Sequence, residues 1–338
     1  MTHGPAPQPA RWQLLWARWR HGVAALSFIA GVASFALIER QERVAQALVI
    51  LLPLSWLLPM IEPWLQRLAE RRPRLRAGSV VFGYAAQTIH QESLFFTLPF
   101  FFATTEWRSP QAVFTAAMIA LALVSVLDPI YYGKVVPRRA ALWAFHACAA
   151  FVTVLTAAPM LWHLTTAQSL QLGLLCLAVV SVPAWHALLA SLPAVPRGLG
   201  ALALGALLGW AGWQARVAIP PATLWVADMR MTTSIDVARR EPGTAVHSID
   251  AAALASGGLY AWSSIRVPRG LRERVEHHWI HRGRLIDVIP LEVSGGREAG
   301  YRAWSHKTAF PADPRGRWEV RVVTTSGQLI GHGYFTVR

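Results

Sequence analysis

Apolar residues dominate the chain up to about residue 219 and come in runs long enough to cross a membrane. At about 1.5 Å per helical residue, roughly 20 residues match the ~30 Å hydrocarbon core of a bilayer. The runs fall at Gly22–Ile38, Val44–Ile61, Gly78–Thr104, Gln111–Leu127, Ala140–Met160, Gln168–Ala190 and Gly198–Ala218. We therefore predict seven transmembrane helices. Six is the alternative, because the first two runs are short, Pro53 and Pro59 interrupt the second, and the two could form a re-entrant pair.

The run at Gly198–Ala218 is the last predicted transmembrane segment and the stalk of the C-terminal domain. Its small residues, which offer close packing to neighbouring helices, are Gly198, Gly205, Gly209 and Gly212. Trp210 and Trp213 suit a membrane interface, and Pro220-Pro221 stops the helix.

The pattern changes at Thr223 to short segments with a period of two, separated by turn residues. Trp318, Val320 and Val322, for example, alternate with Glu319 and Arg321, as in a half-buried strand. The predicted strands are Thr223–Met229, Leu259–Val267, Arg274–His281, Leu285–Val293, Gly300–Phe310, Trp318–Thr324 and Leu329–Val337, with Arg230–Ser256 as a less patterned connection. About seven short strands favour an immunoglobulin-like β-sandwich over residues 220–338.

The N-terminal residues 1–20 form a tail that precedes the helical domain of residues 21–219. Trp12, Leu15, Trp16 and Trp19 share one helical face within Arg11–Arg20, which predicts a helix lying on the membrane surface. The alternative is that this segment simply begins the first spanning helix. The first apolar run is followed by charged residues rather than a small-residue cleavage site, so we expect no cleavable signal peptide.

Composition and charge agree with a membrane protein and set its orientation. The chain is 54% hydrophobic and 15% charged, with a net charge of +14. Twelve Lys and Arg lie in residues 1–20, 67–76, 134–139 and at Arg197, whereas the alternate short loops hold only Arg40, Arg43 and Arg108. The positive-inside rule then puts the N-terminus in the cytoplasm and the C-terminal domain outside. Because the positive charge follows the topology and no nucleic-acid-binding module occurs, we expect no nucleic-acid partner.

Three segments of the C-terminal domain carry a resemblance to known proteins. They are His278–Asp287, Gly295–Lys307 and Gly316–Val322. Over residues 259–338 the chain resembles the short C-terminal domain of uncharacterised, multi-spanning bacterial inner-membrane proteins, a domain of unknown function. The resemblance implies a periplasmic domain and brings no catalytic residues with it.

The predicted third helix, Gly78–Thr104, carries polar residues near its middle. Gln87, His90 and Gln91 share one face by helical spacing, and Glu92 lies about 100° further round. An ionisable residue at that depth suggests a proton relay, a metal or haem ligand, or an acid–base pair. A polar seam that joins helices by hydrogen bonds is the interpretation we favour. His146 and His186, in the fifth and sixth predicted helices, both lie toward the inner side, whereas His90 lies deeper, so a single three-histidine metal site is not expected.

The C-terminal domain offers a possible ligand surface and a histidine cluster. Aromatic residues with arginines suit sugars or acidic polymers, and the candidates are Arg297, Tyr301, Arg302 and Trp304. Trp279 and Trp318 are candidates for the same surface, although Trp318 fits a sandwich core better. His277 and His281 would lie about 13 Å apart along a strand, with His278 on the opposite face, so these histidines favour structural or surface roles over zinc binding.

The remaining signals are consistent with a protein that is not an enzyme. Cys148 and Cys176 both fall in apolar runs and fit buried thiols, and Asp128-Pro129 with Tyr131-Tyr132 fits a helix stop with interface anchors. We expect no catalytic residue, metal or cofactor. The leading hypothesis is a bacterial inner-membrane protein whose periplasmic domain binds an envelope polymer or a membrane or periplasmic protein. The alternative is a transporter or enzyme that uses the polar residues of the third helix.

Overall fold

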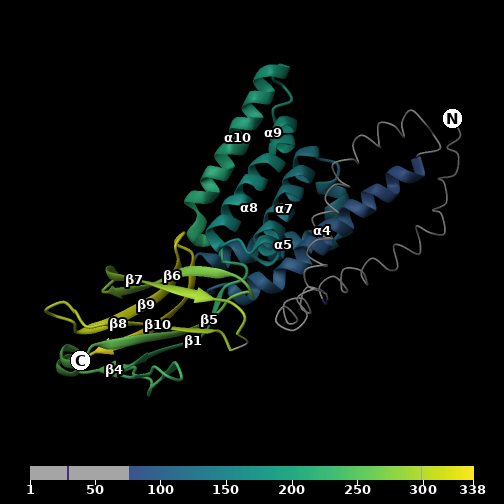
Figure 1. Ribbon diagram of the computed structural model, residues 1–338. Helices are drawn as coiled ribbons and strands as arrows, with labels where there is room; N and C mark the ends of the chain where they lie inside the picture. Colours follow the sequence, from purple (N-terminus) through teal and green to yellow (C-terminus); the bar gives the residue numbers. More distant parts are fainter. Residues whose placement is uncertain (1–28, 30–75, 298) are drawn as a thin grey trace, which may run out of the picture.

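The computed structural model describes residue 29, residues 76–297 and residues 299–338 (Figure 1), with side chains described from Ala86 onward in the first long helix. The surface helix predicted at Arg11–Arg20 and the first two predicted spans, Gly22–Ile38 and Val44–Ile61, lie outside the described residues.

The helical region follows the predicted apolar runs closely. Its helices are α4 (Arg76–Thr104), α5 (Gln111–Val126), α6 (Asp128–Ile130), a π-helical turn (Tyr131–Val135), α7 (Arg139–Trp162), α8 (Thr166–Val180), α9 (Val182–Leu188), α10 (Ala194–Gln214) and a 3₁₀ turn (Arg216–Ala218). Thr165 caps α8 with a capping box, in which its hydroxyl accepts from the Gln168 amide N–H. Pro220 and Pro221 follow the last turn, as expected for the end of the stalk.

Three described helical segments are long and apolar enough to cross a membrane: Arg139–Trp162, Thr166–Leu188 and Ala194–Gln214. A fourth is possible if α5 and the segment Asp128–Val135, which bend by 88° at their junction, count as one broken span. Helix α4 does not join this set, and its polar residues Gln87, His90, Gln91 and Glu92 are the physical reason. The structure therefore supports a helical region with about three apolar spans.

The glycine face of α10 packs against α8. A Cβ on Gly205 would lie 2.6 Å from the Ala178 carbonyl oxygen, and one on Gly212 would lie 2.5 Å from Leu174 Cδ2. Gly198, by contrast, has nothing within 4 Å of its Cβ position. Beside this contact, an apolar groove of about 410 Å³ between α8 and α10 includes Leu175, Val179 and Trp210. Its lining suits lipid acyl chains.

The C-terminal domain contains two main sheets. A three-stranded sheet has the order β1 (Trp225–Thr232), β5 (Leu259–Arg266), β8 (Tyr301–Lys307). A five-stranded sheet has the order β4 (Ser248–Ile249), β10 (Leu329–Val337), β9 (Gly316–Thr324), β6 (Arg272–His281), β7 (Arg284–Ser294). Within these sheets all strand pairs are antiparallel except β4 with β10. All seven predicted strands are present, with ends that shift by a few residues.

The core of this domain lies between the two sheets. Trp279 of β6, Trp318 of β9 and Phe335 of β10 pack there with Leu259 and Ala261 of β5. Along β9 the side chains of Trp318, Val320 and Val322 are buried while Arg321 is exposed, as the alternation predicts. A sheet pair sharing one apolar core is the architecture that period-two patterns favour.

The segment between β1 and β5 contains structure that the sequence pattern does not reveal. A small hairpin pairs β2 (Ile235–Asp236) with β3 (Glu241–Pro242), and the short helix α11 (Ala251–Gly257) precedes β5. Two-residue strands are too short to show a period, which is why periodicity predicts only a connection here.

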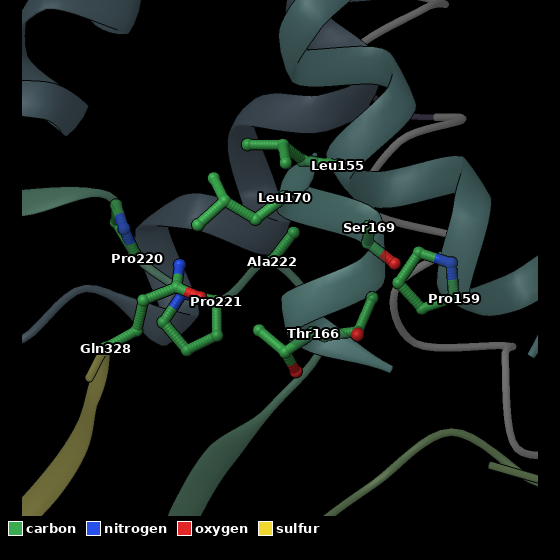
Figure 2. Close-up of a pocket in the computed structure, with 10 residues that line it drawn as sticks. Leu155, Pro159, Thr166, Ser169, Leu170, Pro220, Pro221, Ala222 and Gln328 are labelled. Atoms are coloured by element: carbon green, nitrogen blue, oxygen red, sulfur yellow. The ribbon is translucent and has the colours of Figure 1, made fainter. Parts of the chain in front are cut away.

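The helical region and the β domain meet through buried polar contacts. The Gln328 side-chain amide donates to the Ile219 carbonyl at 2.8 Å, and the Gln111 amide donates to the Leu329 carbonyl at 2.8 Å. Gln328 and Thr166 also line a cavity of about 10 Å³ between α7, α8 and the linker, room for one water molecule (Figure 2). The two parts therefore form one packed unit.

Candidate functional site

The polar residues predicted on one face of α4 meet the bend between α5 and α6. The Gln87 amide donates to the Ser125 carbonyl and to Asp128 Oδ1, both at 3.0 Å, and the Tyr132 hydroxyl donates to Gln87 Oε1 at 2.8 Å. The Gln91 amide donates to the same Ser125 carbonyl at 2.7 Å. A carbonyl next to a sharp bend lacks a regular helical partner, and the two glutamines supply donors there.

A second branch of this network joins three helical segments through His90. Its Nδ1 lies 2.9 Å from the Tyr131 hydroxyl, and its Nε2 lies 3.1 Å from Nδ1 of His146 on α7. All three side chains are buried. The prediction of an interface anchor is wrong for Tyr131, because the π-helical turn directs this side chain into the helix packing, where it is fully buried.

Glu92 stands apart from the network. Its side chain is half-buried and has no hydrogen-bond or ion-pair partner among the described residues. His186 is exposed on α9, whereas His90 and His146 are buried. Within the described residues no group of three His, Cys, Asp or Glu side chains is arranged to hold a metal ion.

The geometry of the α4 network suits helix association. Gln87, His90 and Gln91 each bond to groups on other segments, so each polar side chain is satisfied by its neighbours. Two imidazoles that face each other could also share a proton. Glu92 lies on a different face of the helix from these imidazoles, and Asp128, the acid within the network, accepts from Gln87.

The candidate ligand surface of the β domain lies on the outer face of the three-stranded sheet. Trp304 of β8 is half-buried there and pairs across the strands with Trp262 of β5. Tyr301 lies at the start of the same strand. Trp279 and Trp318 lie in the core instead, which confirms the core interpretation of Trp318. The six predicted residues therefore separate into a core pair, Tyr301 at the edge of the core, and three residues on the surface.

Arg240, which no sequence pattern marks as a candidate, covers the two surface aromatic rings. Its guanidinium carbon lies 5.1 Å from the centre of the Tyr301 ring and 5.7 Å from the centre of the Trp304 ring. Its backbone is left-handed, with φ of 55°, and the Trp262 indole N–H donates to its carbonyl at 3.0 Å. A left-handed arginine is strained by about 1 kcal/mol, and strain of this kind is concentrated at functional sites.

The arginines on this face differ in their charge partners. Arg302 donates to the Arg239 carbonyl at 2.9 Å and to Glu241 at 3.2 Å, so it holds the β2–β3 hairpin. Arg297 lies over Tyr301, 5.7 Å from the ring centre. Neither Arg240 nor Arg297 has an acidic partner among the described residues. The surface thus gathers two positive charges around one tyrosine, and neither is paired with an acid within the part of the chain that the structure describes.

The three histidines of β6 are structural. His277 is fully buried between Ser263 and Ser305, at 3.0 and 2.8 Å, and burial lowers its pKa to about 3 with a smaller contribution from the nearby His278. His278 lies 2.8 Å from Glu276, and His281 stacks on Trp318 at 4.4 Å. The strand thus directs them to three different environments, in agreement with the predicted structural role.

The sequence gives only weak signals for Arg240, Ser125 and Tyr131, which contribute to the two sites but were not predicted to do so. Arg240 precedes Glu241-Pro242-Gly243, whose Pro-Gly pair indicates a turn but says nothing of which rings the arginine will cover. The partners Ser125 and Tyr131 of the α4 network belong to segments more than 30 residues further along the chain.

Comparison with known proteins identifies families but no function. A family model described as a family of unknown function (DUF5924) matches residues 7–261. A second, described as a protein of unknown function (DUF2914), matches residues 272–337. No curated protein and no solved structure matches the chain. The first match ends inside β5, at residue 261, and the second begins with β6, although β5 pairs with both β1 and β8.

Proposed function

The chain belongs to the family of unknown function DUF5924, and we propose that it is an integral membrane protein whose β domain binds a component of the cell envelope. The proposal includes seven spans in a bacterial inner membrane, a cytoplasmic N-terminus and a periplasmic domain of immunoglobulin-like type. The protein acts by binding rather than by catalysis.

The orientation rests on charge and on which helix ends meet the β domain. The C-terminal ends of α7 and α10 contact that domain, as do the residues that follow α4. The opposite, N-terminal ends of α7 and α10 carry Arg138, Arg139 and Arg197. The length of α7 puts its basic end about 36 Å from the end that contacts the β domain. Basic residues at the end away from the β domain support a cytoplasmic position for that end.

One observation carries the binding function: Arg240 and Arg297 gather around Tyr301 with no acidic partner among the described residues. A guanidinium held over an aromatic ring keeps its outward donors for a ligand and loses little side-chain entropy on binding. Half-buried Trp304 beside it adds an apolar face suited to a sugar ring. The surface therefore fits an acidic sugar polymer of the envelope.

Binding of polygalacturonate, a carboxylated sugar polymer, tests this proposal. The full chain in detergent should bind it, and Arg240→Gln and Trp304→Ala should each weaken binding by about 5- to 30-fold, the effect of losing 1–2 kcal/mol. Arg317→Gln is the matched control, because Arg317 also covers a tyrosine, Tyr334, at 4.1 Å, but on the five-stranded sheet. Equal binding by the unsubstituted chain and the three variants would show that this surface is not the binding site.

A further inference from the structure

One turn of the β domain, at residues 267–271, and the adjoining start of β6 lie against the end of α7 and the start of α8. A Cβ on Gly270 would lie 2.7 Å from Nε2 of His163, the residue that ends α7. Beside it, Glu273 accepts from the Thr166 amide N–H at 2.6 Å and from the Thr166 hydroxyl at 2.9 Å. Gly295 donates to the Leu271 carbonyl at 2.9 Å, which ties the turn at residues 294–300 to the turn at residues 267–271.

These two turns present exposed arginines. Arg269 and Arg297 are exposed, and the Cγ of Arg269 lies 3.7 Å from the Cβ position of Gly296. Neither has an acidic partner among the described residues, since Glu273 is turned inward to Thr166 and Glu298 lies outside them. Arg274, one residue beyond Glu273, shows the contrast, because it pairs with Glu292 at 3.2 Å.

Aromatic side chains also lie near the junction between the helix ends and the β domain. Trp162, the last residue of α7, is 59% exposed. Trp213 lies under the Arg216 guanidinium at 5.0 Å, and Trp225 lies under that of Arg266 at 5.7 Å. Tryptophans that flank apolar helices favour the headgroup region of a bilayer, where an apolar ring and a polar N–H are both satisfied.

The length of α7 indicates where this junction lies relative to the bilayer. Its 24 residues span about 36 Å, which exceeds the ~30 Å hydrocarbon core, so the end of the helix reaches the headgroups. Gly270 touches the residue that ends this helix, and Arg269 is its neighbour in sequence. The arginines are thereby held where lipid phosphates lie.

We propose that the end of the β domain nearest the helices binds the headgroups of anionic phospholipids through Arg269 and Arg297. This inference rests on the proposed function, because it names one envelope component that the domain recognises. A phosphodiester accepts paired hydrogen bonds from a guanidinium, and a basic residue beside an anionic lipid surface strengthens binding about fivefold. The bound lipid would hold the β domain close to the membrane.

A local reporter tests the proposal in the full chain. Ser294 is exposed at the end of β7, and an environment-sensitive fluorophore on Ser294→Cys, with Cys148→Ala and Cys176→Ala, reads only this end of the domain. Phosphatidylglycerol titrated into detergent micelles should change the fluorescence saturably, and phosphatidylcholine with the same acyl chains should not. Arg269→Gln with Arg297→Gln should raise the half-saturating phosphatidylglycerol fraction about 25-fold, and the double Lys variant should restore most of the response.

The matched control lies at the other end of the domain. Arg284 and Arg315 are exposed near the turn between β6 and β7, about 33 Å from Arg272 along β6, and Arg284→Gln with Arg315→Gln should leave the response unchanged. A double Arg269→Gln, Arg297→Gln protein that responds like the parent would overturn the inference. The inference would also be overturned if phosphatidylglycerol did not change the fluorescence of the labelled protein that keeps both arginines. If that protein still binds polygalacturonate through Arg240, the proposed function stands while the lipid inference fails.

Discussion

At the scale of single residues, several buried polar groups of the described chain find hydrogen-bond partners on distant segments. His277 bonds to Ser263 and Ser305 in the β core, and Gln87 bonds to three groups around the α5–α6 bend. Removing such a residue leaves its partners buried without hydrogen bonds, which costs about 1–3 kcal/mol. Removing a residue that has no hydrogen-bond partner leaves no other group unsatisfied.

The buried His277 predicts acid sensitivity. Its folded pKa of about 3 lies below the value near 6.5 of an unfolded histidine, so below pH 6.5 protons bind the unfolded chain first. Its stabilising contribution is therefore complete above pH 6.5 and falls between pH 6.5 and 3, by up to about 1.4 kcal/mol per pH unit. Thermal unfolding across this range should show a smaller pH dependence in His277→Gln. The exposed His247→Gln is the control, and an unchanged slope in His277→Gln would contradict this role.

The two kinds of polar residue on α4 should differ in their effect on stability. Gln87→Leu removes three hydrogen bonds and should lower the free energy of unfolding in detergent by about 1–3 kcal/mol. Glu92→Gln should change it by less than about 0.5 kcal/mol and should still restore a deletion strain. A stable Glu92→Gln protein that fails to restore function would favour the transporter or enzyme alternative.

The sequence predicts part of this site and cannot predict the rest. Helical spacing puts Gln87, His90 and Gln91 on one face and turns Glu92 aside, as observed. Their partners Tyr131 and His146 come into contact only through tertiary packing, which no local pattern encodes. The same holds for Arg240, whose position over Tyr301 depends on a hairpin of two-residue strands.

At the scale of elements, periodicity is reliable wherever a segment is long. The apolar runs predict α5, α7 and α10 to within a few residues, and alternation predicts strands β5 to β10. The predicted helix stop at Asp128-Pro129 agrees with the end of α5 at Val126, whereas the 88° bend there and the helix α11 escape prediction, because each involves only a few residues. Whether the β domain is immunoglobulin-like in topology stays a prediction.

The glycines of α10 offer a matched test of helix packing. Gly205→Ala puts a methyl group 2.6 Å from the Ala178 carbonyl oxygen, so α10 and α8 must separate and the unfolding temperature in detergent should fall. Gly198→Ala meets nothing within 4 Å and should stabilise the helix by about 0.5–1 kcal/mol. Equal effects from the two substitutions would show that close α8–α10 packing is unimportant.

At the scale of the whole molecule, the β domain and the helices act as one body. Buried bonds from Gln328 and Gln111 join them, and Glu273 reaches the start of α8. Burial raises the pKa of Glu273, while the bonds from Thr166 act in the opposite direction. With the helices spanning a membrane as proposed, a domain fixed in this way would present its arginine surfaces at a set height above the bilayer, so the proposed binding depends on which side of the membrane the domain occupies.

The side of the membrane is tested most directly by fusing a reporter to the C-terminus, after Arg338. If the β domain is periplasmic, alkaline phosphatase, which is active only outside the cytoplasm, should be active in this fusion, and a reporter active only in the cytoplasm should be silent. The bias of basic residues and the odd number of predicted spans are the reasons. A silent phosphatase together with an active cytoplasmic reporter would place the β domain inside the cell and contradict the proposed function.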